Sequence, residues 1–207
     1  MTLQEEHTVE LFSGPEKPFS NIASFLGYRT TTFDPNPDYQ ADVVAAAADA
    51  DPTRFPSTPI MVWMAPPSEG FADKSGWDSS NFAPITESAT FAEEHLSQCL
   101  NLANQMKAKW WFLETPKSYL RQLPLMRGFN RGYPSRNRYT FKPKEWGGAG
   151  TKEIDVYTNA FWWTPRSSDK GNALVTPLSV DRYRAPPSVY LDMLNQYDAY
   201  LRSKGQR

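Results

Sequence analysis

The sequence has one cysteine and only two histidines, and these shortages exclude several kinds of site. Cys99 has no second cysteine with which to form an intrachain disulfide or a cysteine-based zinc site. His7 and His95 are interpreted as surface or packing residues, which disfavours catalysis built on histidine. We therefore expect no metal site, and a reducing, cytoplasm-like compartment.

Long hydrophobic runs are missing as well. The longest apolar runs fall far short of a membrane span, so we expect no membrane partner and no signal peptide. A length of 207 residues with 40% hydrophobic residues predicts one globular domain, 1–207. Its core is expected at about 8–160, and a C-terminal extension and helix at about 161–207. The 18 prolines favour long, shaped loops over a helix bundle.

Acidic residues are absent between Thr115 and Lys144, although the net charge of the chain is only −1. This stretch interleaves aromatic residues with eight cations: Lys117, Arg121, Arg127, Arg131, Arg136, Arg138, Lys142 and Lys144. One interpretation is a surface that pairs with DNA phosphates. The other is a solvated face whose charges are balanced in space by acids from elsewhere in the chain.

Apolar patterning predicts that strands and helices alternate along the first half of the chain. Strands are expected at 8–13, 28–33, 60–64 and 110–113, helices at 19–26 and 87–109, and a short helix or irregular segment at 42–51. This alternation indicates an α/β fold with a parallel sheet. Later, strands at 138–142 and 154–157 flank a Gly147-Gly148 turn, and an amphipathic helix covers 187–201.

The residues that follow these strands are the first candidates for a site, because ligands of doubly wound sheets bind at the carboxyl ends of the strands. The ends are Phe12-Ser13-Gly14, Asp34, Ala65-Pro66-Pro67-Ser68 and Glu114-Thr115-Pro116. An acid that closes the second strand is suited to holding ribose hydroxyls. The alternatives are a plain turn aspartate for Asp34 and a surface strand end for Glu114.

Several of these segments carry a family resemblance. Leu11-Phe12-Ser13-Gly14 resembles the first motif of the DNA cytosine-5 methyltransferases, and Pro66-Pro67-Ser68-Glu69-Gly70-Phe71-Ala72 resembles their catalytic loop. Glu114-Thr115-Pro116 is similar to their Glu-Asn-Val motif. Segments 120–126, 152–159 and 182–187 resemble the compact bacteriophage forms. The resemblance runs in order from Leu11 to Leu201.

The resemblance implies a Rossmann-like, S-adenosylmethionine-dependent methyltransferase fold, with a mostly parallel sheet and helices on both faces. It implies a cofactor pocket lined by Phe12, Ser13, Gly14, Asp34, Asp42 and Pro66. It also implies that Glu114 binds the Watson–Crick edge of a flipped cytosine, and that Arg136 and Arg138 face the cytosine or its phosphates. DNA is the implied partner, and the host cytoplasm the implied location of a phage protein.

Two departures from the family bear on activity. Ser68 stands where the family has its nucleophilic cysteine, and a serine hydroxyl is far harder to ionise than a thiol. Pro15 to Pro18 replace the small residues that let the backbone approach the cofactor. We therefore expect weakened cofactor binding and no useful methylation at carbon 5.

Three functions stay open at this point. The first is a cytosine-5 methyltransferase, the second a silent relative that binds DNA or protein, and the third a cytosine modification without a thiolate adduct. The loop at Pro66-Pro67 also resembles the motif of the amino-methyltransferases. That motif continues with an aromatic residue, where this chain has Ser68, so this interpretation ranks lower.

Overall fold

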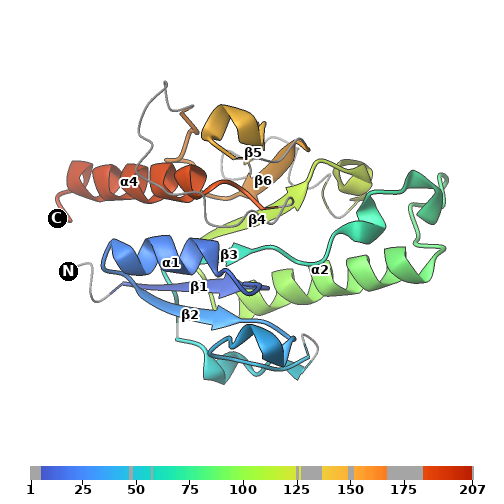
Figure 1. Ribbon diagram of the computed structural model, residues 1–207, viewed down its shortest axis with the longest axis horizontal. Coiled ribbons are helices and arrows are strands. Elements are labelled where there is room, and N and C mark those ends of the chain that lie inside the picture. Colours follow the sequence, from blue (N-terminus) through green and yellow to red (C-terminus); the bar gives the residue numbers. More distant parts are fainter. Residues whose placement is uncertain are drawn as a thin grey trace.

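A computed structural model of the protein describes residues 6–46, 49–56, 58–124, 126, 137–148, 152–166 and 184–206. Its centre is a six-stranded sheet of order β2-β1-β3-β4-β6-β5 (Figure 1). The strands are β1 His7–Leu11, β2 Arg29–Phe33, β3 Met61–Met64, β4 Trp110–Pro116, β5 Asn137–Phe141 and β6 Ile154–Thr158. The β2, β1, β3 and β4 strands are parallel, and β6 and β5 extend the sheet in antiparallel pairing.

Two helices make crossovers between parallel strands. Helix α1 (Pro18–Phe25) connects β1 to β2, and α2 (Glu87–Gln105) connects β3 to β4. The chain between β2 and β3 contains no α-helix among its described residues, but part of the segment 42–51 lies outside them, so the short helix or irregular segment expected there stays a prediction. Val43 forms a parallel bridge to Phe33, which fastens this connection to the edge of the sheet.

The helices cover both faces of the sheet (Figure 1). Helix α2 lies on one face, and α1 lies beside the terminal helix α4 (Pro187–Ser203) on the other. The expected α/β architecture, mostly parallel with helices on both faces, is confirmed. None of the helices within the described residues combines the length and apolar character that crossing a bilayer requires.

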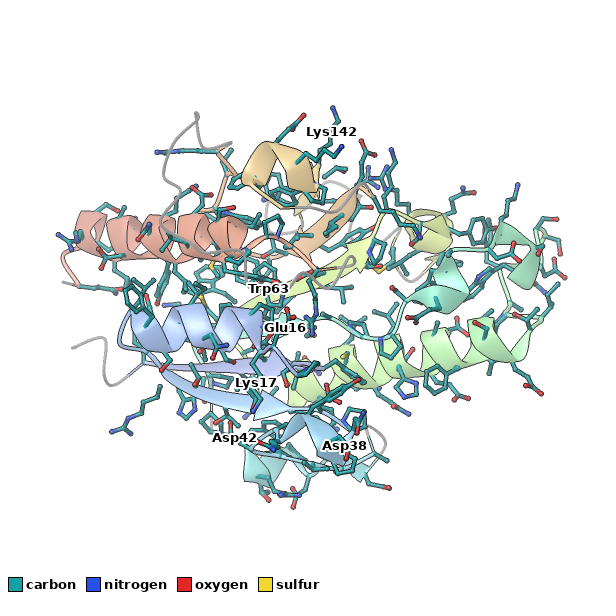
Figure 2. The ribbon with its side chains drawn as sticks, viewed as in Figure 1. Glu16, Lys17, Asp38, Asp42, Trp63 and Lys142 are labelled. Atoms are coloured by element: carbon teal, nitrogen blue, oxygen red, sulfur yellow. The ribbon has the colours of Figure 1, made fainter. Side chains whose placement is uncertain are left out.

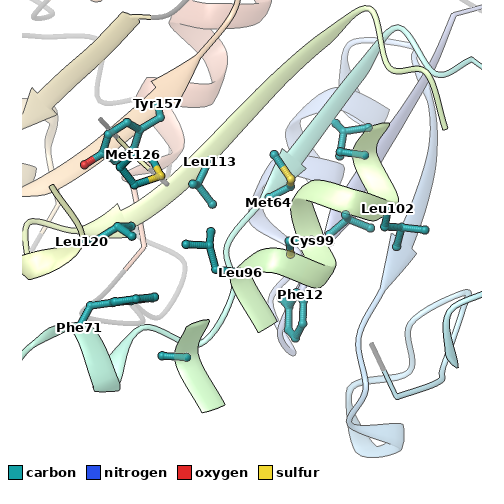
Figure 3. Packing of buried hydrophobic residues seen from close by; sticks show 14 of the residues in the cluster. Phe12, Met64, Phe71, Leu96, Cys99, Leu102, Leu113, Leu120, Met126 and Tyr157 are labelled. Carbon is teal, nitrogen blue, oxygen red and sulfur yellow. The ribbon is translucent and has the colours of Figure 1, made fainter. Parts of the chain in front are cut away.

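The core under α2 follows from strand alternation and helix periodicity. Side chains on alternate positions of a strand point to opposite faces, so Val9 and Leu11 of β1 point toward α2. Helix α2 presents Leu96, Cys99 and Leu102 to them along one stripe (Figure 3). The hydroxyl of Thr86 caps the start of α2 by accepting a hydrogen bond from the Ala89 amide at 3.2 Å.

The core on the opposite face is mainly aromatic. The Trp63 ring of β3 stacks on Phe112 of β4, with centroids 5.1 Å apart, and meets Tyr190 of α4 edge-on at 4.8 Å. Near its end, α4 returns to the start of the chain, where the Tyr197 hydroxyl donates to Glu6 at 3.2 Å. The first strand and the last helix are therefore joined on this face.

Candidate functional site

The strand ends predicted to form a site lie at one edge of the sheet. Leu11 is in register with Phe33 on one side and with Met64 on the other, and Met64 is in register with Leu113. The residues that follow each of them therefore emerge at the same level. This edge carries the turn after β1, Asp34, the loop after β3 and Glu114.

The turn after β1 is tied to the end of β2. The Ser13 amide donates to the Phe33 carbonyl at 3.0 Å, and the Gly14 amide donates to Oδ2 of Asp34 at 2.9 Å. Oδ1 of Asp34 accepts a second hydrogen bond from the Asn36 amide at 2.9 Å. Both oxygens of this buried carboxylate thus hold backbone of the chain itself.

The other two predicted cofactor residues differ in exposure. Asp42 is exposed, but its Oδ2 accepts from the amide of Thr32 at 2.7 Å and from the hydroxyl of Thr32 at 2.9 Å. Figure 2 places it beyond β2, near Asp38. Pro66 is buried at the start of the loop after β3. Asp42 is therefore engaged with β2, whereas Pro66 offers no polar side-chain group.

The loop that carries Ser68 is fixed against α2. A Cβ atom on Gly70 would lie 2.1 Å from the Ser88 carbonyl oxygen, so only glycine allows this approach. The Trp77 indole donates to the Gly70 carbonyl at 2.9 Å. Ser68 is half-buried, and its amide donates to the Glu69 carboxylate at 3.0 Å. Its hydroxyl has no hydrogen-bond partner within the described part of the chain, so no base activates it there.

Cys99 does not replace the missing nucleophile. Its thiol is buried in the α2 core (Figure 3), and burial raises the pKa of the thiol far above its ordinary value, although the charge of Arg184 opposes the shift. A thiolate is the reactive form, so this cysteine is inert.

Glu114 is the most constrained of the predicted residues. Its side chain is buried, and three donors converge on its two oxygens. Oε1 accepts from the amide of Ala185, just before α4. Oε2 accepts from the indole of Trp63 at 2.7 Å and from the hydroxyl of Tyr190 at 2.9 Å. Trp63 lies between α1 and α4 (Figure 2), so the carboxylate points into the core of that face.

A second carboxylate shares this environment. Glu10 of β1 is in register with Trp63 and points to the same face. Its oxygens accept from the Ser20 amide at 2.8 Å and the Phe19 amide at 3.4 Å, at the start of α1. These amides need an acceptor because the first turn of a helix has no internal one. Glu10 thus satisfies the helix terminus that would otherwise attract an anion.

Arg184 lies beside both carboxylates. Its guanidinium is 4.0 Å from Oε1 of Glu10 and donates to the carbonyl of Phe12, whose φ of 58° is in the left-handed region. A Cβ atom on Gly14 would lie 3.6 Å from Nη2 of Arg184, so the guanidinium lies next to the glycine turn. We call Glu10, Trp63, Glu114, Arg184 and Tyr190 the buried polar cluster.

The charges of this cluster are two carboxylates and one guanidinium. Burial raises the pKa of Glu114 and of Glu10, and the charge of Arg184 is the largest opposing influence for each. Burial likewise raises the pKa of the Tyr190 phenol, and the charge of Glu114 adds to that effect. The cluster therefore retains protons more readily than the same groups would in water.

The structure does not bring all the predicted catalytic residues together. Arg138 is opposite Tyr157, which is opposite Leu113, and cross-strand partners share a face, so Arg138 lies on the α2 face. The loop of Ser68 also turns toward α2, whereas Glu114 points toward α1 and α4. Arg136 lies outside the described residues.

Several cations of the stretch from Thr115 to Lys144, which has no acidic residue, form ion pairs with acids that lie outside it. Lys117 pairs with Glu153, and Arg121 binds both oxygens of Asp155 at 2.5 Å. Lys142 pairs with Glu145, which follows the stretch directly, at 3.3 Å. Arg138 and Lys144 are exposed, and neither pairs with a carboxylate in the described regions. Arg127 and Arg131, like Arg136, fall in the part that is not described.

Several solved structures similar to this chain are methyltransferases. The Dnmt2 methyltransferase of S. pombe matches with a TM-score of 0.52 and 9% sequence identity, over 82% of this chain and 57% of that one. The chain has the methyltransferase fold. The methyltransferase EhMeth of Entamoeba histolytica (TM-score 0.49, 14% identity, 77% and 53% covered) and the METTL16 methyltransferase domain (0.46, 12%, 76% and 73%) are also similar.

At these identities the similarity establishes the fold alone. The chain spans little more than half the length of the Dnmt2 and EhMeth proteins. No protein-family model matches the sequence, and no curated protein matches it in sequence.

At the carboxyl edge, where the fold suggests that S-adenosylmethionine would bind, the polar groups that would face the cofactor are engaged within the chain. Arg184 lies against the glycine turn, Asp34 is engaged through both oxygens, and Glu10 occupies the start of α1. The groove beside the first turns of α2, between Pro84 and Glu94, contains none of the predicted site residues. Among the described residues, no three histidine, cysteine, aspartate or glutamate side chains are placed to hold a metal ion.

Sequence reasoning missed four members of the buried polar cluster: Glu10, Trp63, Arg184 and Tyr190. One signal was available for Glu10, a carboxylate within the apolar run of a strand predicted to be covered on both faces. Such an acid needs buried partners. The partners themselves are distant in sequence, since Tyr190 is 76 positions from Glu114.

Proposed function

We propose that this protein is a DNA-binding member of the methyltransferase fold that does not methylate cytosine at carbon 5. The observation that carries the proposal is the engagement of Glu114. The carboxylate that would have to read a flipped base is bound by Ala185, Trp63 and Tyr190. A base reaching it would have to displace hydrogen bonds from the backbone before α4 and from two aromatic side chains.

Two further features support the loss of methylation. Ser68 lacks the thiolate chemistry of a cysteine, and its hydroxyl has no basic partner in the described structure. The glycine turn is held by Asp34 and flanked by Arg184, where a cofactor would have to approach. The nucleophile, the base pocket and the cofactor pocket are therefore all altered, and restoring one of them would leave the other two.

DNA binding is supported by the exposed cations of the stretch from Thr115 to Lys144. Arg138 and Lys144 are available to phosphates because Glu153, just before β6, pairs with Lys117 and Asp155 of β6 pairs with Arg121. The proposal assigns the salt-sensitive part of DNA affinity to these two side chains and to Arg127, Arg131 and Arg136 of the same stretch.

The test combines calorimetry with S-adenosylmethionine and a tritium-transfer assay on cytosine-containing DNA, for the unaltered chain and for Ser68→Cys. We expect no binding heat and no turnover from either protein. Turnover by the unaltered chain, with label at carbon 5, would refute the proposal. Turnover by Ser68→Cys alone would show that both pockets are intact, and would refute the roles assigned here to Glu114 and to the glycine turn in the loss of methylation.

A further inference from the structure

Four aromatic side chains gather at the edge of the sheet opposite Glu114. Trp110 begins β4, Phe161 and Trp162 follow β6, and Tyr200 lies in the last part of α4. Because β6 is antiparallel to β4, its end lies beside the start of β4, where Thr158 is opposite Phe112. We call Trp110, Phe161, Trp162 and Tyr200 the aromatic platform.

The ring of Phe161 is held by edge-to-face contacts with two other members of this platform. Its ring meets Trp110 at 5.5 Å and 75°, and Tyr200 at 5.8 Å and 89°. Trp162 stacks on Tyr200 at 6.0 Å and 20°. Edge-to-face contacts of this kind fix the orientation of a ring. Phe161 nevertheless remains 54% exposed, so a fixed aromatic face is open to solvent.

The rim of the platform is positively charged. Nζ of Lys109 lies 5.8 Å from the Trp110 ring centroid, and Nζ of Lys204 lies 5.9 Å from that of Tyr200. The segments 95–113 and 159–166 contain no acidic residue, and Asp198, which lies beside Tyr200 on α4, is paired with Arg202. The charge of this surface is therefore complementary to phosphate.

The platform also holds unused hydrogen-bond donors. The indole nitrogens of Trp110 and Trp162 are buried and have no acceptor within the described structure. A buried donor without an acceptor is unfavourable. Base carbonyls and phosphate oxygens are acceptors of the kind that these two groups lack, and Trp162 is only half-buried, so a small ring movement would expose its donor.

We propose that the aromatic platform binds single-stranded nucleic acid. A base stacks on the exposed face of Phe161, and the adjoining phosphates pair with Lys109 and Lys204. Single strands are favoured over duplex because the face of a paired base is covered by its neighbours in the stack. This site lies at the opposite edge from Glu114 and shares no residue with the stretch from Thr115 to Lys144, so it does not rest on the function proposed above.

The test is the affinity of the full chain for an oligothymidylate of about 12 nucleotides, measured by anisotropy and by quenching of tryptophan emission. We expect Phe161→Ala to weaken binding by about 5- to 100-fold. The matched control is Phe91→Ala on α2, which is similarly exposed at 51% and should bind as the unaltered chain does. Unchanged affinity of Phe161→Ala, or an equal loss in Phe91→Ala, would overturn the proposal.

The lysines provide a second readout. A Lys109→Gln, Lys204→Gln double variant should lower the slope of log affinity against log salt by about 1.4 for the single strand. An unchanged slope would refute the phosphate contacts. A double variant of Arg138 and Lys144 separates the two proposals, because it should affect duplex binding and leave the effect of Phe161→Ala on the single strand unchanged.

Discussion

The backbone amide of Ala185 donates a hydrogen bond to Oε1 of Glu114, a residue 71 positions earlier in the chain. Glu114 lies near the end of a central strand, and Ala185 immediately precedes the proline-led start of α4. Their contact joins the last segment of the chain to the carboxyl edge of the sheet. Glu114 stands where a ligand-binding group was predicted, but it accepts hydrogen bonds from within the chain. Substitutions in the buried polar cluster should therefore change the stability of the protein.

Removing the Tyr190 hydroxyl should destabilise the protein. Tyr190→Phe deletes one of the two donors to the buried Oε2 of Glu114, and Trp63 remains as the other, so we expect the loss of one hydrogen bond, about 0.5–1.5 kcal/mol. Urea denaturation measures the free energy of unfolding. Tyr200→Phe on the same helix is the control, because its phenol makes no hydrogen bond within the described residues. Equal stability of the two variants would contradict the assigned role of Tyr190.

Arg184 should be the most sensitive member of the cluster. Arg184→Met leaves Glu10 and Glu114 buried without their shared cation, and breaking a buried ion pair on one side costs about 3–5 kcal/mol. Arg202→Met removes an exposed pair with Asp198 at 2.8 Å and should cost less than about 1 kcal/mol. Thermal denaturation of both variants gives the comparison, and a loss at Arg184 as small as at Arg202 would count against the cluster.

The raised pKa of Glu114 predicts a pH dependence of known sign. Its folded pKa lies above the ordinary value of 4.5, so the folded state holds the proton more tightly than the unfolded state. Its stabilising contribution is therefore complete below about pH 4.5 and is lost as the pH rises through the folded pKa.

Glu114→Gln tests this sign, because glutamine does not titrate but keeps the size of the side chain. The glutamine side chain ends in one oxygen and one NH2 group. The NH2 group is a donor and would face the donors that surround position 114, so the variant should be less stable than the unaltered chain at low pH. The difference in stability between the variant and the unaltered chain should shrink as the pH rises above about 4.5 and through the raised pKa of Glu114. A difference that stays constant or grows over this range would show that the carboxyl group is not held protonated by burial.

Gly70 should tolerate no side chain. In Gly70→Ala the new Cβ would be 2.1 Å from the Ser88 carbonyl oxygen and 2.9 Å from the Ala89 Cα, both backbone atoms of the start of α2. We expect a loss of about 1–3 kcal/mol in the free energy of unfolding. Ala72→Ser, an exposed change two residues later, should alter it by less than about 0.5 kcal/mol. A stable Gly70→Ala protein would mean that the Ser68 loop is free to move from α2.

The DNA-binding proposal predicts which cations set the salt dependence. Arg138→Gln and Lys144→Gln should each lower the slope of log affinity against log salt by about 1 for duplex DNA. Lys74→Gln, an exposed lysine in a turn near α2, is the control and should leave the slope unchanged. Loss of affinity without a change of slope in Arg138→Gln would indicate a contact other than a phosphate.

The sequence predicts the part of the fold that depends on local patterning. The run Val9 to Leu11, the stripe of α2 and the glycine turn at Gly14 follow from periodicity and turn chemistry, which act over a few residues. The order of strands at the β6 edge does not follow from it, because antiparallel pairing of β4 with β6 depends on contacts made after the whole chain has folded.

The candidate site is predictable to the same extent. The convergence of Gly14, Asp34 and Glu114 on one edge follows from the rule that parallel strands end together. The hydrogen bonds that their polar atoms make do not follow from the sequence, because the partners are distant along the chain. Oδ2 of Asp34 is bound by Gly14, 20 positions away, and Glu114 by Trp63, 51 positions away.

The two cores differ in when their residues leave the ribosome. Among the residues that the structure describes, the core under α2 contains none later than Tyr157, whereas the aromatic core opposite it includes Ala185 and α4 residues as late as Leu201. During synthesis from the amino end, α2 can cover one side of the sheet before Tyr190 of α4, which contacts Trp63 and Phe19 on the other side, has been made. Nascent chains stopped before α4 should thus expose a broad aromatic surface and be recognised by chaperones, whereas chains that include α4 should cover this surface.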